Sequence, residues 1–152
     1  MSQVHIWWIR RDIRLKDNQT LQAAMKNAEN LIPLFILEPE LMGAAAPKRR
    51  AFILNALKDL DVQLRDLGSR LIVRQGPAKR AFADLKEDFP DFAIFAHEDF
   101  SPFARERDAD IKESYHLSLH PGVVLHHPTA VLKDDGDPYI VYTPYKLSLI
   151  HI

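Results

Sequence analysis

Two charged segments carry the residues whose types could recognise a ligand. The first, residues 10–18, holds four basic and two acidic side chains directly after a short apolar run. The second, residues 97–108, places Phe100 and Phe103 around a serine that can cap a helix, with Asp99 beside them. Aromatic rings next to a carboxylate that accepts hydrogen bonds would suit a flat ligand. Each segment also has an ordinary structural explanation, as a salt-bridged loop and as a helix cap with core phenylalanines.

Several patterns that carry chemistry in other proteins are missing. The sequence has no cysteine, which excludes disulfides, thiol nucleophiles and cysteine-ligated metals. None of its five glycines follows the first apolar run, so the dinucleotide fingerprint and the P-loop are both absent. His116 and His120 have the spacing of two metal ligands on a helix, but Pro121 and Gly122 would end that helix. We therefore expect no metal site, and no serine lies in a hydrolase elbow.

The composition limits the partners that the chain could bind by itself. With 152 residues it has the size of one domain, and its 20 basic and 21 acidic residues give a formal net charge of −1. This balance offers no global attraction for DNA, so a DNA contact would need a local patch or another domain. The longest apolar stretch, residues 31–37, is too short to span a membrane, and no signal peptide is recognisable. The expected location is the cytoplasm.

Short apolar runs alternate with segments of helical periodicity. The runs predict five strands, at residues 4–9, 31–37, 70–74, 92–96 and 123–125. The other segments predict four helices: one capped by Asp17 or Asn18, one over residues 48–67 ended by Gly68, one from Pro77 to Asp88 and one capped by Ser101. This alternation predicts an α/β fold, a Rossmann-like open parallel sheet of about five strands with helices on both faces. The first strand, apolar on both sides, should be central, and a polar turn at residues 133–138 could join two short strands.

The predicted sheet gives the two charged segments a common position. In an open parallel sheet, ligands bind outside the carboxyl ends of the strands, near the point where the strand order reverses. The segments follow the first and the fourth predicted strands directly. We therefore expect them to lie side by side at this edge and to form the ligand site.

Six motifs in order, including these two segments, resemble the photolyase/cryptochrome family. They lie at residues 7–18, 35–39, 67–71, 76–77, 98–108 and 136–145 and so cover nearly the whole chain. The first reads WWIRRDIRLxDN, and the fifth reads EDFxPFxxxRD. The resemblance implies that residues 1–145 form the N-terminal antenna domain of that family. Residues 146–152 are expected to be a tail that departs from it.

The function that this resemblance implies is light harvesting for a deoxyribodipyrimidine photolyase, the light-driven lyase that repairs pyrimidine dimers in DNA. FAD and DNA would be bound by a separate C-terminal helical domain outside this chain, which the antenna domain would contact. The chain alone is then expected to be a monomer without lyase activity and without membrane contacts. The residues that would contact the antenna pigment are Arg10, Arg11, Phe35, Ile36, Leu37, Asp99 and Phe103.

The resemblance also favours one class of pigment. Folate-binding members of the family carry an Asn-Glu pair where this chain has Phe103 and Ala104, so a deazaflavin or flavin mononucleotide (FMN) is expected instead of a folate. The ring would lie against residues 35–37, Asp99 would accept a hydrogen bond from its polar edge, and Arg11 with its neighbours would meet the polar tail. Three alternatives remain open: a cryptochrome-type photoreceptor, a domain that has lost its pigment, and a stand-alone nucleotide-binding domain. The missing glycine-rich loop argues against the last.

Overall fold

The computed structural model describes residues 4–43, 46–122, 124 and 127–150. Five parallel strands form one sheet in the order β3-β2-β1-β4-β5. Their bounds are β1 Val4–Ile9, β2 Asn30–Leu37, β3 Ile72–Gln75, β4 Phe92–His97 and β5 His116–His120. The predicted α/β sheet and the central place of β1 are confirmed. All six residues of β1 are buried, as expected for a strand covered on both faces.

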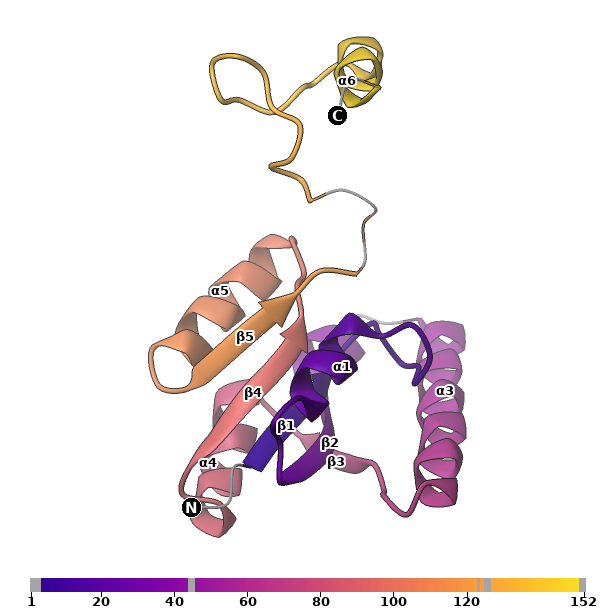
Figure 1. Ribbon diagram of the computed structural model, residues 1–152. Helices are drawn as coiled ribbons and strands as arrows, with labels where there is room; N and C mark the ends of the chain where they lie inside the picture. The colour runs from indigo at the N-terminus through magenta and orange to yellow at the C-terminus, as the bar shows by residue number, and fades with distance from the viewer. Residues whose placement is uncertain (1–3, 44–45, 123, 125–126, 151–152) are drawn as a thin grey trace.

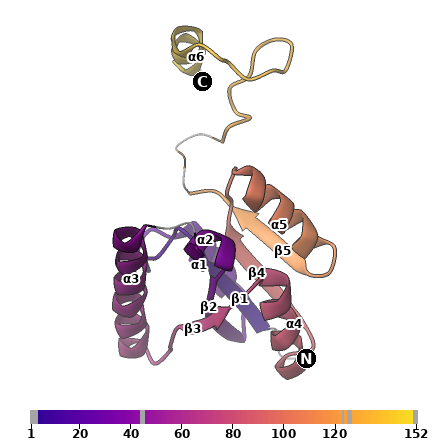
Figure 2. The same ribbon diagram turned by 180° about the vertical axis from the view of Figure 1, so that it is seen from behind.

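Helices cover both faces of the sheet (Figures 1 and 2). On one face, Trp7, Ile9 and Phe35 pack against α1 (Gln19–Met25) and α3 (Pro47–Asp66). On the other face, the core contains Trp8, Ile36 and residues of α4 (Ala78–Asp88) and α5 (Pro102–Lys112). This division follows from the strand period of two, because Trp7 and Trp8 point to opposite faces.

The predicted helix ends are confirmed at three positions. The Asn18 side chain accepts a hydrogen bond from the Leu21 N–H at 2.9 Å, and the Ser101 hydroxyl accepts one from the Ala104 N–H at 3.3 Å. Each cap satisfies an amide that the first turn leaves without an intrahelical partner. Gly68 follows α3 with φ +77°, a left-handed conformation that suits glycine.

Two predictions about the C-terminal part of the chain are wrong or untested. The fifth strand is not at residues 123–125 but at His116–His120, where Leu117 and Leu119 pack against the α4/α5 face. Of the predicted residues, 123 and 125 lie outside the described ranges, and Val124 lies in no strand. Residues 133–138 contain a turn but join no strands in the described part of the chain. An edge strand paired only with β4 tolerates the alternating HLSLH sequence, so apolar content did not identify the fifth strand.

Two helices were not expected from the sequence. The short α2 (Pro39–Gly43) follows β2, and α6 (Tyr142–Leu149) lies near the C-terminus. Figure 1 shows that the chain leaves the sheet after β5 and that α6 lies apart from it. No residue of α6 is buried. Within the described ranges, no helix combines the length and apolarity needed to cross a membrane.

Candidate functional site

A cavity of about 130 Å³ lies at the carboxyl ends of the central strands. Here the strand order reverses, since β1 is followed in sequence by β2 on one side and is paired with β4 on the other. The cavity is lined by Trp8, Ile9, Arg10, Arg11, Phe35, Ile36, Glu38, Arg49, Ile53, Asp99, Ser101, Phe103, Ala104 and Arg107. The two charged segments therefore do meet at the edge that the sheet topology indicated.

Six of the seven residues expected at the site line this one cavity. Phe35 and Ile36 reach it from β2, the two arginines follow β1, and Asp99 and Phe103 follow β4. Leu37 is the exception, because it is half-buried and packs against the α1/α3 core instead. The cavity is thus apolar toward the sheet and charged along its rim.

Asp99 is held as a carboxylate at the rim. Its Oδ2 forms an ion pair with Arg11 Nη2 at 3.0 Å, and its Oδ1 accepts a hydrogen bond from the Ser101 N–H at 3.0 Å. Burial alone would raise the pKa of Asp99, but the hydrogen bonds from Ser101 and the positive charges of Arg11 and Arg107 outweigh it and lower the pKa. A carboxylate has about four lone-pair sites, so Asp99 can still accept a hydrogen bond from a ligand.

Arg10 belongs to a buried charge network. Its guanidinium donates to Asp108 at 2.9 and 2.6 Å and to the His97 carbonyl at 2.9 Å. Arg107 pairs with Glu38 at 2.6 Å and with Asp108 at 3.3 Å. Both guanidiniums lie over the Trp8 ring, 3.8 and 4.7 Å from its centroid. These four charged side chains therefore fix α5 against the ends of β1 and β2.

Asp12 fixes the loop that carries Arg10 and Arg11. Its carboxylate accepts hydrogen bonds from the Trp7 indole at 3.1 Å, from the Arg10 amide at 3.0 Å and from the Asn18 side chain at 3.1 Å. Asp12 and Asn18 are buried, and Asn18 also caps α1. The strand end, the loop and the next helix are thereby held in one arrangement, which sets the direction of both arginines.

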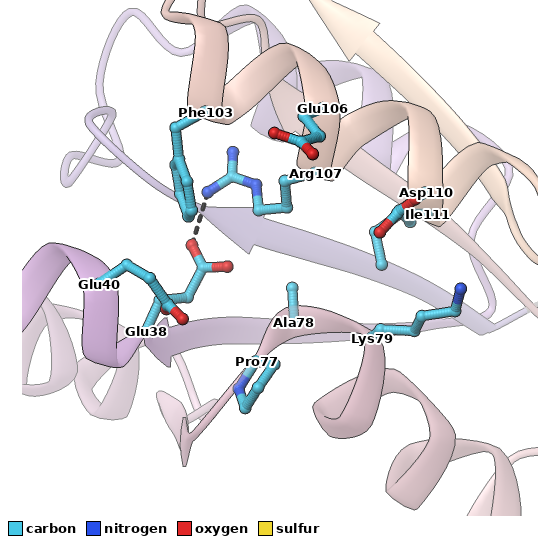
Figure 3. A pocket seen from close by; sticks show the side chains of 10 residues that line it. All are labelled: Glu38, Glu40, Pro77, Ala78, Lys79, Phe103, Glu106, Arg107, Asp110 and Ile111. Carbon is cyan, nitrogen blue, oxygen red and sulfur yellow. Dashed lines mark hydrogen bonds and ion pairs between the residues drawn. The ribbon is translucent and has the colours of Figure 1, made fainter.

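A second, larger cavity lies on the other side of Phe103 and Arg107 (Figure 3). Its volume is about 290 Å³, and its remaining lining residues are Glu38, Glu40, Pro77, Ala78, Lys79, Glu106, Asp110 and Ile111. Figure 3 shows the Phe103 ring beside the Glu38–Arg107 ion pair. Phe103, 36% exposed, thus contributes to both cavities.

Sequence reasoning missed several residues of the first cavity. Trp8 was assigned only to the first predicted strand, and Arg49 and Ile53 only to the predicted helix over residues 48–67. The spacing of Arg49 and Ile53 by four residues, which puts both on one face of α3, was the available signal. Glu38 directly follows β2 at the same sheet edge, so the rule that located the other loops could have found it.

The lining of the first cavity offers both apolar and charged contacts. In the described part of the chain, no group of three His, Asp or Glu side chains could hold a metal ion. The cavity combines apolar and aromatic walls with carboxylates and four arginines. Such a lining is suited to a flat conjugated molecule with a polar edge.

Comparisons with known proteins agree with this architecture. The family model described as DNA photolyase matches residues 5–149. The chain is 33% identical to a deoxyribodipyrimidine photo-lyase of Synechococcus sp., covering 95% of this chain and 31% of that protein. It is 39% identical to chicken (Gallus gallus) cryptochrome-2 over 70% of this chain and 19% of that protein.

Solved structures give the same result. A class III photolyase of Agrobacterium tumefaciens superposes with a TM-score of 0.84 at 26% identity, covering 100% of this chain and 32% of that one. An archaeal photolyase of Sulfolobus tokodaii was solved with two FAD molecules that imply a novel light-harvesting cofactor. It superposes with a TM-score of 0.75 at 29% identity, covering 86% of this chain and 32% of that one. The chain spans about a third of the length of these photolyases. From the family-model match and this shared fold, the chain belongs to the DNA photolyase family.

Proposed function

We propose that this chain is a light-harvesting module, which binds a flat antenna pigment in the cavity at the ends of β1, β2 and β4. The observation that carries the proposal is the convergence of Arg10, Arg11, Phe35, Ile36, Asp99 and Phe103 on one cavity. These residues come from three separate parts of the sequence, and the family resemblance assigns the same residues to the pigment. Light absorption itself requires no nucleophile or metal, only a pigment fixed in one orientation.

The proposed ring position follows from the cavity walls. Phe35 and Ile36 are buried, apolar and on opposite faces of β2, so an aromatic ring would lie against the carboxyl end of that strand between them. Asp99, ionised because its pKa is lowered, would accept a hydrogen bond from an N–H at the edge of the ring. The volume of about 130 Å³ is smaller than the roughly 300–1,000 Å³ of most ligand pockets, so part of the ring would lie in the open mouth.

We favour a deazaflavin or FMN over a folate as the pigment. Phe103 offers only a ring, and Ala104 is buried and contributes its amide to the Ser101 cap. Neither side chain can accept a hydrogen bond from a pterin amine, and leaving such a group buried without an acceptor costs about 1–3 kcal/mol. The photolyase of Sulfolobus tokodaii, with its two FAD molecules, supports a flavin-type light harvester in a related protein.

The rest of the function would belong to a longer protein. We propose that a helical domain following this chain binds FAD and DNA, with the antenna domain ending near residue 145 and passing its excitation to that FAD. The chain itself is proposed to be monomeric. A repair photolyase and a signalling cryptochrome are both compatible with the proposal, since relatives of both kinds match.

Pigment binding can be tested on the purified chain. FMN, a deazaflavin and a folate are titrated separately. Binding is followed by pigment fluorescence and by quenching of the total tryptophan fluorescence, which comes from Trp7 and from Trp8 at the cavity. We expect the two tricyclic rings to bind and the folate not to. Asp99→Ala should weaken ring binding by about tenfold through loss of one charged hydrogen bond.

The matched control is Asp91→Ala. Asp91 is exposed and precedes β4, whereas Asp99 follows the same strand at its other end. The control removes the same charge far from the cavity and should leave binding unchanged. Binding of the folate without binding of FMN or the deazaflavin would refute the choice of pigment. If Asp99→Ala bound the tricyclic rings as tightly as the unchanged chain, Asp99 would have no role in binding them. If no pigment bound, the proposed function would be refuted.

A further inference from the structure

A groove of about 510 Å³ lies at the amino ends of β2 and β3, at the opposite end of these strands from the first cavity. Its apolar lining includes Leu31 and Ile32 of β2 and Ile72 of β3. The ends of α3 and α4 border it, with Arg65 and Phe89 among the lining residues. No residue lines both this groove and the first cavity, so a ligand bound here would not depend on the pigment.

The groove exists because β3 is shorter than its neighbour. Strand β2 has eight residues, but β3 pairs only with Leu34–Leu37 at its end. The chain before β3 follows α3 instead, because the Asp61 carboxylate accepts a hydrogen bond from the Leu71 N–H at 2.9 Å. Residues 31–33 of β2 are therefore left without a neighbouring strand on their outer side.

The open side of β2 presents backbone groups as well as side chains. The Leu37 carbonyl accepts a hydrogen bond from the Gly76 N–H at 3.1 Å, on the side where β3 lies. Alternate residues of a strand direct their backbone groups the same way, so the N–H and C=O of Leu31 also face this side. An open strand edge can pair with another extended chain. A peptide has the backbone groups for such pairing, whereas a nucleic acid does not.

The charged side chains around this edge are mainly basic. Arg65, Arg70 and Arg74 line the groove, against the single carboxylate of Asp88. Arg65 and Lys86 lie in the last turns of α3 and α4, where they offset the partial negative charge of the helix ends. Arg70 and Arg74 are exposed and pair with no carboxylate in the described ranges. The groove therefore complements a negatively charged segment.

We propose that this groove is a docking site for an acidic, extended peptide segment of a partner protein. The segment lies beside residues 31–33 of β2, with its backbone hydrogen-bonded to Leu31. Its apolar side chains contact Ile32 and its carboxylates meet Arg70 and Arg74, whose planar guanidiniums can donate two parallel hydrogen bonds to a carboxylate. The groove is small and its arginines are open to water, so the complex is a weak and transient one.

The test uses the whole chain and labelled hexapeptides, with binding followed by fluorescence anisotropy. Valine alternates with glutamate in one peptide, with serine in the second and with lysine in the third. The glutamate peptide should bind about tenfold more tightly than the serine peptide, as expected for two solvent-exposed charge contacts, and the lysine peptide should bind least. A single-stranded DNA of six nucleotides should bind more weakly than the glutamate peptide, because it cannot pair with the strand edge.

Arg74→Glu reverses one charge of the groove, and Arg80→Glu is its matched control. Arg80 is exposed on α4 and does not line the groove. Arg74→Glu should lower the affinity for the glutamate peptide about tenfold and raise that for the lysine peptide. Arg80→Glu should change both by less than about twofold, since only attraction screened by salt is altered. Equal urea midpoints would show that both variants are folded, and neither should change pigment binding.

Four outcomes would overturn the inference. Equal affinity for the glutamate and serine peptides would exclude recognition of acidic side chains. An equal loss in Arg74→Glu and Arg80→Glu would show general electrostatic attraction and no site in the groove. Tighter binding of the DNA than of the glutamate peptide would make the groove a nucleic-acid site. If no peptide binds, the groove is no docking site, and its arginines only protect the open strand edge from aggregation.

Discussion

Replacing Asp108 by asparagine should destabilise the domain strongly, because it leaves a buried arginine without its counter-ion. The side chains of Arg10 and Asp108 are 7% and 5% exposed. Burial lowers the pKa of Arg10, repulsion by Arg107 lowers it further, and hydrogen bonds and charge from Asp108 and Glu38 oppose this. In the unchanged chain two guanidiniums face two carboxylates; in the variant they face only one.

The size of the effect follows from the fate of that charge. Removing one partner of a buried ion pair costs about 3–5 kcal/mol. The amide of the substituted residue would still accept one hydrogen bond, and Arg10 would still donate to the His97 carbonyl. We therefore expect the free energy of unfolding to fall by about 3 kcal/mol, the lower end of that range. With a urea dependence of about 2 kcal/mol per molar, the unfolding midpoint should fall by roughly 1.5 M.

The assay is urea unfolding followed by tryptophan fluorescence, with Asp110→Asn as the control. Asp110 lies on the same helix two residues later, is exposed, and should change the free energy of unfolding by less than about 0.5 kcal/mol. Equal midpoints for the two variants, or a shift below about 0.3 M for Asp108→Asn, would refute the argument that this network fixes α5.

Two further predictions concern activity and pH. The purified chain should not repair thymine dimers under blue light, even with added FAD. We assign FAD and DNA binding to a following domain, and the net charge of −1 attracts phosphates weakly. Light-dependent loss of dimers would contradict this prediction. Burial lowers the pKa of both His97 and His120 from 6.5, so protonation favours the unfolded chain. The contribution of the two neutral histidines to the free energy of unfolding is therefore fully present above pH 6.5 and is lost as the pH falls below that value. Urea unfolding midpoints measured at about pH 7.5 and about pH 5 should differ less for His97→Leu than for the unchanged chain.

The sheet and the position of the site could be predicted because they depend on local patterns. Apart from His5, Val4–Ile9 is apolar throughout, as is typical of a strand that is covered on both faces. Asn18 and Ser101 cap helices through amides that lie three residues away in the sequence. Once the strands are parallel, their carboxyl ends must share one edge. The loops after β1 and β4 were therefore placed together without any knowledge of their contacts.

The partners of the charged residues could not be predicted, because they depend on contacts between distant segments. Arg10 and Asp108 are separated by 98 positions in the sequence, and Arg107 and Glu38 by 69. No pattern in the sequence says which arginine pairs with which carboxylate. The fifth strand was misplaced for a related reason: at the sheet edge, pairing with β4 tolerates the alternating HLSLH sequence, so apolar content alone is a poor guide.

The alternation of side chains along β1 explains why two neighbouring arginines differ in their surroundings. Trp8 faces α4 and α5, and Arg10, two residues later, continues on that side and is enclosed between Trp8 and Asp108. Arg11 follows Ile9, which faces α1 and α3, by two residues, and its side chain remains 59% exposed at the rim. The strand period therefore assigns Arg10 to the framework of the site and leaves Arg11 where a ligand can reach it. Exposure after the end of the strand, and not charge alone, separates an arginine that builds a cavity from one that can meet its occupant.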